Sequence, residues 1–101
     1  LLWEFPGGKC HPGESHAECL HREILEELGL EISVGNRISS ISHDYEDFRV
    51  ILHFYKCVRL QGEPQLLQCN DFRWVTSAQL SDYAFPEADS AFLSYLRSFV
   101  P

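Results

Sequence analysis

The clearest pattern of hydrophobic and polar positions in this chain predicts a helix near its amino end. Four apolar residues recur there at the spacing of one helix face, about 100° per residue: Ala17, Leu20, Ile24 and Leu28. Ser15 followed three residues later by Glu18 is typical of an N-terminal capping box, and Gly29 is typical of the residue just past a last helical turn. The segment between Ser15 and Gly29 is therefore predicted to be an amphipathic helix that packs on a core.

Downstream of this helix, apolar residues alternate with polar ones or form short runs, which is the pattern of β-strands. Turn-forming residues at 35–36, 44–47 and 61–64 separate these stretches. The predicted strands are residues 31–34, 37–43, 48–55 and 72–75. The third of them is apolar on both faces at its centre, as expected of a central strand.

The carboxyl-terminal part is predicted to be helical. Ser77 can cap a short turn over residues 78–80, and apolar residues return at helical spacing in a terminal helix, at Ala88, Phe92, Leu96 and Phe99. Two main helices among irregularly alternating strands indicate an α/β fold, with a mixed β-sheet between helices on both faces. Residues 3–5 look like the tail of a strand, so we expect residues 1–101 to be a single domain whose N-terminal strand is missing.

Composition narrows the possible functions. The chain has 101 residues, enough for one hydrophobic core, and 45% of them are hydrophobic. A net charge of −7 argues against polymeric nucleic acid, whose phosphates it would repel, but suits a small nucleotide accompanied by divalent metal. No apolar run reaches the roughly eighteen residues of a membrane span. These features favour a cytoplasmic protein with a small-molecule partner, and they leave the oligomeric state open.

The chain contains four cysteines: Cys10, Cys19, Cys57 and Cys69. They lack C-x-x-C spacing, and a domain with a good core has little need of disulfides, so we expect reduced thiols. Cys10, His11 and His16 are the residues that could hold zinc. Their spacing matches no common zinc site and His11 precedes a proline, so we do not expect one.

The polar side of the predicted helix carries a concentrated set of charges: Arg22, Glu23, Glu26 and Glu27. At this spacing the three carboxylates converge on one face. They lie near the carboxyl end of the helix, where the macrodipole disfavours anions, so a cation should compensate them. Arg22 could do so in an ordinary salt-bridged, solvated face. The other candidate is Mg²⁺, which is held by carboxylates in nucleotide sites.

Together with the residues before them, these charges form one continuous pattern. It reads Gly8, five residues, Glu14, seven residues, Arg22-Glu23, two residues, Glu26-Glu27, one residue and Gly29. This pattern resembles the signature box of the Nudix hydrolases, and seven fixed positions would coincide by chance on the order of once in a billion registers. Residues 2–9, Leu-Trp-Glu-Phe-Pro-Gly-Gly-Lys, resemble the segment that leads into the box in the MutT-like branch, the nucleoside triphosphate pyrophosphohydrolases. The resemblance implies the three-layer α/β/α Nudix fold.

The resemblance also implies a Mg²⁺ site, with Mn²⁺ as the alternative ion. The implied metal ligands are the Gly7 carbonyl oxygen and the carboxylates of Glu23, Glu26 and Glu27. Glu23 would bind the metal or deprotonate the attacking water, and Glu14 and Arg22 would orient Glu23. The implied substrate-binding residues are Glu4, Phe5, Lys9, Tyr45 and Asp89.

Several of these residues also have ordinary structural explanations. Gly7 could serve only to turn the chain, and Lys9 could simply pair with a carboxylate of the box. Phe5 and Tyr45 could be core aromatics, although Phe5 aligns with the base pocket of the family. Asp89 could merely favour the positive end of the terminal helix.

The chain departs from the family pattern at two positions. Gln68 aligns where related enzymes commonly carry a further glutamate, so additional metal ions would be held less tightly unless Asp71 substitutes. Asp89 follows residues 85–88 where members selective for oxidised guanine carry asparagine. An ionised aspartate only accepts hydrogen bonds, and both cytosine and guanine offer donors, so the base is left open.

The expected activity is Mg²⁺-dependent hydrolysis of a nucleoside triphosphate to the monophosphate and pyrophosphate, with removal of 8-oxo-dGTP from the nucleotide pool as one such role. One alternative is hydrolysis of a nucleoside diphosphate linked to another group, because the box binds the diphosphate. The other is a non-catalytic Nudix-fold domain that recognises a DNA lesion. The intact box and the acidic chain argue against that last alternative.

Overall fold

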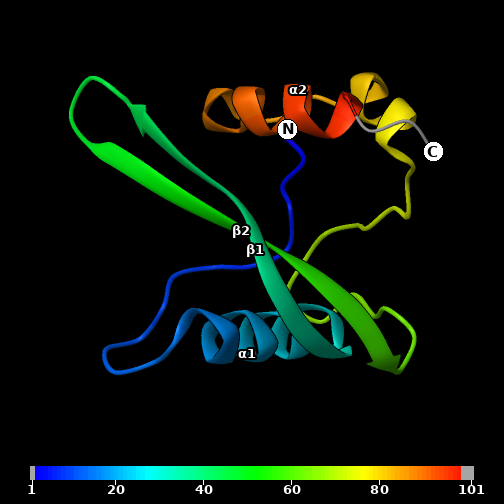
Figure 1. Ribbon diagram of the computed structural model, residues 1–101. Coiled ribbons are helices and arrows are strands. Elements are labelled where there is room, and N and C mark those ends of the chain that lie inside the picture. The colour runs from blue at the N-terminus through cyan, green and yellow to red at the C-terminus, as the bar shows by residue number, and fades with distance from the viewer. Residues whose placement is uncertain (1, 99–101) are drawn as a thin grey trace. The chain divides into compact units, whose positions relative to one another are not determined.

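The computed structural model describes residues 2–98, which form a two-stranded hairpin, two α-helices and two short 3₁₀ helices (Figure 1). In chain order the elements are α1 (His16–Leu28), β1 (Glu31–Asp44), β2 (Arg49–Gln61), η1 (Ser77–Asp82), η2 (Glu87–Asp89) and α2 (Ser90–Arg97). The described residues divide into two compact units. One comprises residues 5–36 and 55–73, and the other comprises residues 2–4, 37–54 and 74–98.

Helix α1 is fixed at both ends by local signals in the sequence. The Ser15 hydroxyl accepts a hydrogen bond from the Glu18 N–H at 3.1 Å, and the Glu18 carboxylate accepts one from the Ser15 N–H at 2.9 Å. Gly29 is left-handed, with φ of 68°, and its N–H donates to the Leu25 carbonyl oxygen. The predicted helix is confirmed.

Strands β1 and β2 pair as an antiparallel hairpin that reverses where the Tyr45 N–H donates to the Phe48 carbonyl oxygen at 2.8 Å. The turn predicted at 35–36 is wrong, because β1 continues through it. A Cβ atom on Gly35 would lie 3.0 Å from the Lys56 carbonyl oxygen of the facing strand. This glycine therefore permits close approach of two backbones and does not turn the chain.

The strand predicted at 72–75 is also wrong for the described residues, since no strand is formed there. The Asp71 carboxylate accepts hydrogen bonds from the Phe72 N–H at 2.8 Å and from the Arg73 guanidinium at 2.9 Å. Arg73 also donates to the Phe72 carbonyl oxygen at 3.0 Å. These local bonds occupy groups that a strand would use for pairing.

In the unit formed by residues 5–36 and 55–73, α1 packs on the adjoining part of the hairpin. The centre of this core is Ile24, Leu30 and Ile32, each no more than 6% exposed. Partly buried residues surround it: Leu20, Leu28, Val34 and Cys57. Ala17, predicted to share the apolar face, is exposed. The face of α1 that packs on this core therefore begins at Leu20.

The other unit has its own small core under α2, built from Leu80, Ala88, Phe92 and Leu93. Phe92 stacks on Phe54 of β2, with ring centroids 3.6 Å apart. Ala88 lies in η2 and not in α2, and Phe99 of the predicted terminal helix falls outside the described residues. The helical prediction for this region is otherwise confirmed. The turn predicted at 78–80 is part of η1, whose cap is Thr76 and not Ser77.

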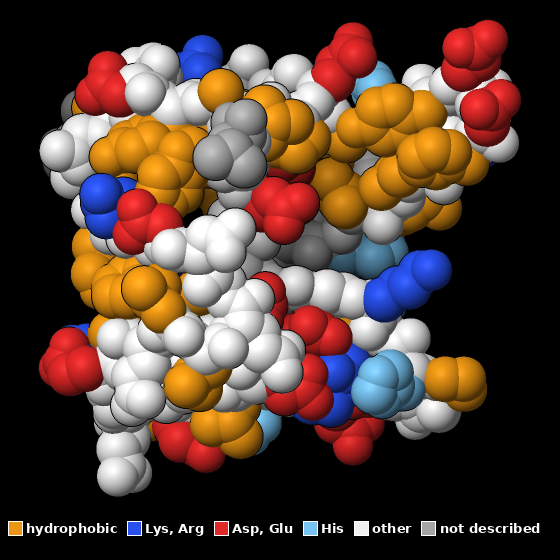
Figure 2. Space-filling view, turned by 180° about the vertical axis from the view of Figure 1, so that it is seen from behind, with side chains coloured by type: hydrophobic (Ala, Val, Ile, Leu, Met, Phe, Trp, Pro, Cys, Tyr) orange, Lys and Arg blue, Asp and Glu red, His pale blue; other side chains and the backbone are white. Residues whose placement is uncertain are grey.

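Many large apolar side chains in the described residues are open to solvent. Several of these residues are more than half exposed, among them Phe48, Ile51, Val58, Leu60 and Trp74. Figure 2 shows hydrophobic side chains gathered in several areas of one face. Among residues 2–98, no helix has the length and apolar character needed to cross a bilayer.

Replacing Ser15 with alanine should lower the free energy of unfolding by about 1 kcal/mol, because the Glu18 N–H loses its side-chain acceptor. Urea unfolding followed by circular dichroism measures this change. Ser94→Ala, at an exposed position inside α2, is the control and should cost less than about 0.5 kcal/mol. Equal losses in the two variants would contradict the importance of the cap.

Candidate active site

The glycine-rich loop before α1 lies against the carboxylates of that helix. The Gly7 N–H donates to a carboxylate oxygen of Glu27 at 3.3 Å. A Cβ atom added to Gly8 would overlap the carboxyl group of Glu23. Gly7 has φ of 145°, a conformation that favours glycine. The two glycines therefore turn the chain and also bring its backbone onto Glu23 and Glu27.

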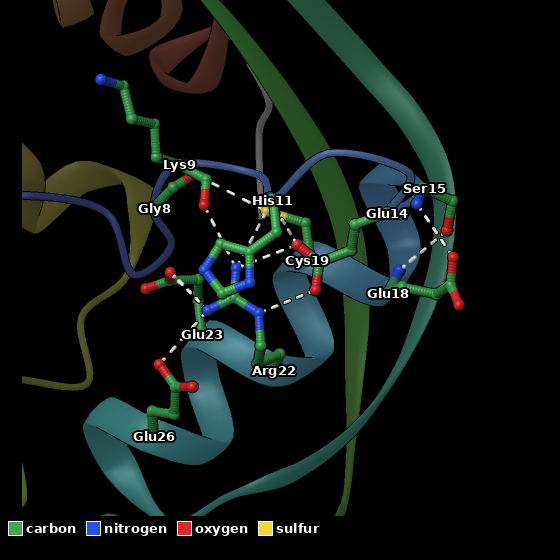
Figure 3. Close-up of polar contacts among 10 residues, drawn as sticks. All are labelled: Gly8, Lys9, His11, Glu14, Ser15, Glu18, Cys19, Arg22, Glu23 and Glu26. Atoms are coloured by element: carbon green, nitrogen blue, oxygen red, sulfur yellow. Dashed lines mark hydrogen bonds and ion pairs between the residues drawn. The ribbon is translucent and has the colours of Figure 1, made fainter.

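Arg22 connects this loop to three acidic side chains (Figure 3). It forms a bidentate pair with Glu14, with its Nε 2.7 Å from one oxygen and its Nη2 3.0 Å from the other. Its Nη1 donates to Glu23 at 2.8 Å and to Glu26 at 3.3 Å. Nη2 also reaches the Lys9 carbonyl oxygen at 3.2 Å. The guanidinium thus fixes the position of Glu23 relative to the loop.

The pairing of Glu14 with Arg22 keeps both groups charged over a wide pH range. Hydrogen bonds from Arg22, then one from the His11 N–H, lower the pKa of Glu14 to about 2. Hydrogen bonds to Glu14 and Glu23 raise the pKa of Arg22 above its already high normal value. Both side chains are largely covered, Arg22 at 22% and Glu14 at 14% exposure. Arg22 and Glu14 thus form a charged, hydrogen-bonded pair beside Glu23.

The donor groups at this end of α1 fit a hard divalent cation. Glu23, Glu26 and Glu27 offer carboxylate oxygens, the donor type that Mg²⁺ and Mn²⁺ prefer. The loop backbone lies directly on two of these carboxylates, so a ligand in the loop would meet them. The hydrogen bond from Gly7 to Glu27 uses the Gly7 amide, whereas the predicted metal ligand is the Gly7 carbonyl oxygen.

A second loop closes the carboxyl end of α1. The Glu27 carbonyl oxygen accepts hydrogen bonds from the N–H groups of Leu67 and Gln68, both at 3.2 Å. The Leu28 carbonyl oxygen accepts one from the Gln65 N–H at 2.9 Å. Carbonyl groups that a helix end leaves unpaired are therefore satisfied by this loop. Gln68 lies next to the carboxylate-bearing turn, while Asp71 is paired with Arg73.

The predicted substrate-binding residues fall in both units. Phe5 and Lys9 belong to the unit that contains the carboxylates, and Lys9 is exposed there. Glu4, Tyr45 and Asp89 belong to the other unit. The residues predicted to bind metal and to orient Glu23 therefore lie in one unit, where Arg22 contacts Glu14, Glu23 and Glu26 and the Gly7 N–H contacts Glu27.

Within that other unit, Asp89 and Tyr45 have distinctive surroundings. Asp89 is 7% exposed, and burial together with the nearby Glu4 carboxylate raises its pKa. Tyr45 stacks on Phe48 with ring centroids 5.1 Å apart and meets His43 edge-on at 4.7 Å. Tyr45 is thus part of a local aromatic cluster at the hairpin turn, and Asp89 is a buried acid.

Sequence reasoning missed two backbone groups of the site. The Lys9 carbonyl oxygen binds Arg22, and the His11 N–H donates to Glu14 at 2.9 Å. Backbone groups leave no signal in residue type, so only the capping and glycine pattern of the loop could have suggested them. Both contacts strengthen the arrangement around Arg22.

A family model for the NUDIX domain matches residues 1–95, which include the whole carboxylate-bearing region. The chain belongs to the Nudix family. The predicted resemblance is therefore confirmed. The chain is a Nudix hydrolase, an enzyme that hydrolyses phosphoanhydride bonds. Nudix hydrolases generally need a divalent metal ion, which agrees with the oxygen donors on α1.

Similar proteins support this assignment. An 8-oxo-dGTP diphosphatase of Buchnera aphidicola subsp. Acyrthosiphon pisum is 29% identical over 96 residues, which cover 95% of this chain and 77% of the relative. A CTP pyrophosphohydrolase of Escherichia coli is 33% identical over 88 residues, 87% of this chain and 65% of the relative. The solution structure of the E. coli ORF135 protein superposes with a TM-score of 0.83 at 32% identity, covering 96% of this chain and 71% of that one. The Nudix hydrolase thus has the predicted Nudix fold.

Replacing Arg22 with glutamine should remove a stabilising effect that depends on pH. The Glu14 pKa is depressed in the folded state, so this stabilisation is fully present above the ordinary value of 4.5 and is lost as pH falls toward about 2. The difference in unfolding free energy between wild type and Arg22→Gln should accordingly be constant above pH 5 and shrink below it. Urea unfolding across this range measures the difference.

NMR titration of the Glu14 carboxyl carbon provides an independent reading of the same effect. Its pKa should return to the ordinary range in Arg22→Gln. Arg49→Gln is the matched control, because Arg49 pairs with the exposed Asp44 at 2.6 Å and not with Glu14. A low Glu14 pKa that persists without Arg22 would show that another group stabilises the carboxylate.

Proposed function

We propose that this Nudix hydrolase is a Mg²⁺-dependent nucleoside triphosphate pyrophosphohydrolase that releases the nucleoside monophosphate and pyrophosphate. The observation that carries the proposal is the fixed set of acids around Arg22, with the glycine loop seated on Glu23 and Glu27. Such a set suits a metal-bound polyphosphate. The names of the two relatives, an 8-oxo-dGTP diphosphatase and a CTP pyrophosphohydrolase, support the same reaction class.

In this proposal the acidic residues of α1 serve as metal ligands, and Glu23 has a second task. Glu26 and Glu27, with Glu23 and the Gly7 carbonyl oxygen, would hold Mg²⁺, with Mn²⁺ as a substitute. The bound ion would offset the phosphate charge and make a water molecule easier to deprotonate. Glu23 would accept the proton of the attacking water.

The support behind Glu23 keeps that carboxylate available for the reaction. Arg22 donates a hydrogen bond to one carboxylate oxygen of Glu23 at 2.8 Å, and this bond sets the direction in which the second Glu23 oxygen points. Glu14 holds Arg22 through two hydrogen bonds and stays ionised at neutral pH. Arg22 and Glu14 therefore act by positioning Glu23, and this fixed geometry is what lowers the barrier.

For the base we propose Asp89, with Glu4 beside it, as the selecting groups, and Phe5 and Tyr45 as stacking candidates. Because Asp89 is buried, a base that contacts it must donate hydrogen bonds to its carboxylate oxygens. Guanine and cytosine carry the N–H donors that such a carboxylate accepts. Lys9, which is exposed, is proposed to approach the phosphates.

We also propose that residues 1–101 act as one catalytic Nudix domain in the cytoplasm, where free nucleotides are its substrates. A substrate panel tests the function as a whole. Purified protein with Mg²⁺ is offered 8-oxo-dGTP, dGTP, CTP, dCTP and nucleoside diphosphate sugars, and the products are separated by chromatography. Pyrophosphate and a monophosphate are expected from at least one triphosphate.

Two results, one from the substrate panel and one from a gel-shift assay, would overturn the proposal. Turnover confined to the diphosphate sugars would reveal a hydrolase of linked diphosphates. Tight binding of lesion-containing DNA in a gel-shift assay, without turnover of any nucleotide, would reveal a recognition domain.

Replacing Glu27 with glutamine should lower kcat by about a hundredfold or more while the fold persists, because it removes a ligand charge from the metal site. Glutamine can still accept the Gly7 N–H. Steady-state kinetics at limiting Mg²⁺ and circular dichroism are the measurements. Glu63→Gln, which loses an exposed charge paired with Arg59, is the control and should retain full activity. Near wild-type turnover of Glu27→Gln would refute the metal assignment.

Replacing Gln68 with glutamate should tighten metal binding, because it adds a carboxylate beside the last turn of α1. An attraction of about 1 kcal/mol between the added carboxylate and Mg²⁺ corresponds to a roughly fivefold lower Mg²⁺ concentration at half-maximal rate. The added repulsion should also destabilise the metal-free protein, so the rise in Tm caused by Mg²⁺ should increase. Gln61→Glu, at the exposed end of β2, adds the same charge as a control. Identical metal titrations for Gln68→Glu and wild type would place the Gln68 side chain away from the metal.

A further inference from the structure

Two cysteine thiols lie side by side next to Arg22. Cys10 is exposed in the loop before α1, and Cys19 is 3% exposed on the first turns of the helix. Their sulfur atoms and a carboxylate oxygen of Glu14 all lie within 4.8 Å of one another. All four cysteines of the chain are free. The fold thus brings together two thiols that are nine positions apart in the sequence.

Glu14, the third member of this cluster, already accepts hydrogen bonds from other groups. One Glu14 oxygen accepts from the Arg22 Nε, and the other accepts from both the Arg22 Nη2 and the His11 N–H. A thiophilic metal ion would have to compete with these charge-assisted bonds. His16, one of the two histidines considered above for zinc, has its Nδ1 2.8 Å from the Tyr55 hydroxyl. The arrangement therefore favours a reaction between the two sulfur atoms over a metal site.

We propose that Cys10 and Cys19 form a reversible intrachain disulfide in the presence of a peroxide, and that this modification lowers the activity of the enzyme. The bond itself is independent of the proposed function, whereas its effect on activity rests on that function. Cys57 and Cys69 take no part. Their sulfur atoms instead lie 3.8 Å and 3.7 Å from the backbone carbonyl oxygens of Tyr55 and Glu27.

The chemistry proceeds in two balanced steps. Peroxide oxidises the exposed Cys10 thiol to a sulfenic acid, and one oxygen of the peroxide leaves as water. The Cys19 sulfur then attacks the Cys10 sulfur, the S–O bond breaks, and a second water leaves with the Cys19 proton. Two thiols and one hydrogen peroxide molecule thus give one disulfide and two water molecules. Burial raises the pKa of the Cys19 thiol to about 12, which agrees with Cys10 reacting first.

The bond would disturb the support behind Glu23. The Cys19 sulfur lies 3.8 Å from the Gly8 carbonyl oxygen, and the Arg22 Nη2 lies 4.0 Å from that sulfur. A disulfide requires an S–S distance of about 2.05 Å and a defined torsion, so the bond would pull the loop at Cys10 toward Cys19. The adjacent Lys9 carbonyl oxygen binds Arg22, and Gly8 lies against Glu23. A shift of this loop therefore moves the groups that orient Glu23.

Peptide mass spectrometry tests the bond directly. Trypsin cleaves after Lys9 and Arg22, so both cysteines fall in the single peptide 10–22. After treatment of the reduced protein with hydrogen peroxide, this peptide should lose two hydrogen atoms in mass. Further cleavage after Glu14 and Glu18 should leave residues 10–14 and 19–22 joined until dithiothreitol separates them. Oxidation that produces only sulfinic or sulfonic acid on Cys10 would overturn the proposal.

Activity supplies the second readout. Peroxide should lower wild-type triphosphate hydrolysis by about tenfold, in keeping with the effect of a small displacement in an active site, and dithiothreitol should restore it. Cys10→Ser should start with normal activity and keep it under peroxide. Cys57→Ser, which retains the pair, should be inhibited like wild type. Equal inhibition of Cys10→Ser and wild type would overturn the regulatory part.

A failure of the proposed function is distinguishable from these results. A reduced protein that hydrolyses no triphosphate would refute the function, while the mass of peptide 10–22 would still report whether the disulfide forms.

Discussion

The interaction on which the site depends is the contact of the Arg22 guanidinium with Glu14, Glu23 and Glu26. Acidic side chains gathered at the carboxyl end of a helix repel one another and face the negative end of its dipole. A fixed arginine offsets part of that repulsion through several charge-assisted hydrogen bonds, in a geometry that lysine could not reproduce. What remains uncompensated is a concentration of negative charge that suits a divalent cation.

The helix and its chemistry could be predicted because their signals are local. The capping box at Ser15 and the terminal Gly29 act within one turn, and the box spacing fixes which side chains share a face. The outcome at residues 35–36 depended on the facing strand, and that at residues 72–75 on the hydrogen bonds that the Asp71 side chain forms with its neighbours; the sequence pattern revealed neither. Gly35 followed by Asn36 was predicted to turn the chain, but Gly35 instead lets its strand approach the Lys56 carbonyl oxygen of the facing strand.

The candidate site divides in the same way. Residue types and spacing were enough to identify Arg22 and its acidic partners, since charged side chains at helical spacing meet predictably. The burial of Asp89 could not be read from the sequence, because aspartate is usually exposed and its surroundings come from segments far apart in the chain. The contribution of the Lys9 carbonyl oxygen was equally invisible, since every residue carries that group.

The closure of the α1 end by the loop at 67–69 has a consequence for how the enzyme is made. Glu27 and Cys69, which meet there, are 42 residues apart, and the whole hairpin lies between them. Contacts of such large sequence separation carry a high loop-closure cost and form after local structure during folding. A nascent chain that has emerged only as far as β2 therefore possesses the helix and its acids, but its helix end is still open. The last turn of α1, which carries Glu26 and Glu27, is thus completed only after the loop at 67–69 has been synthesised.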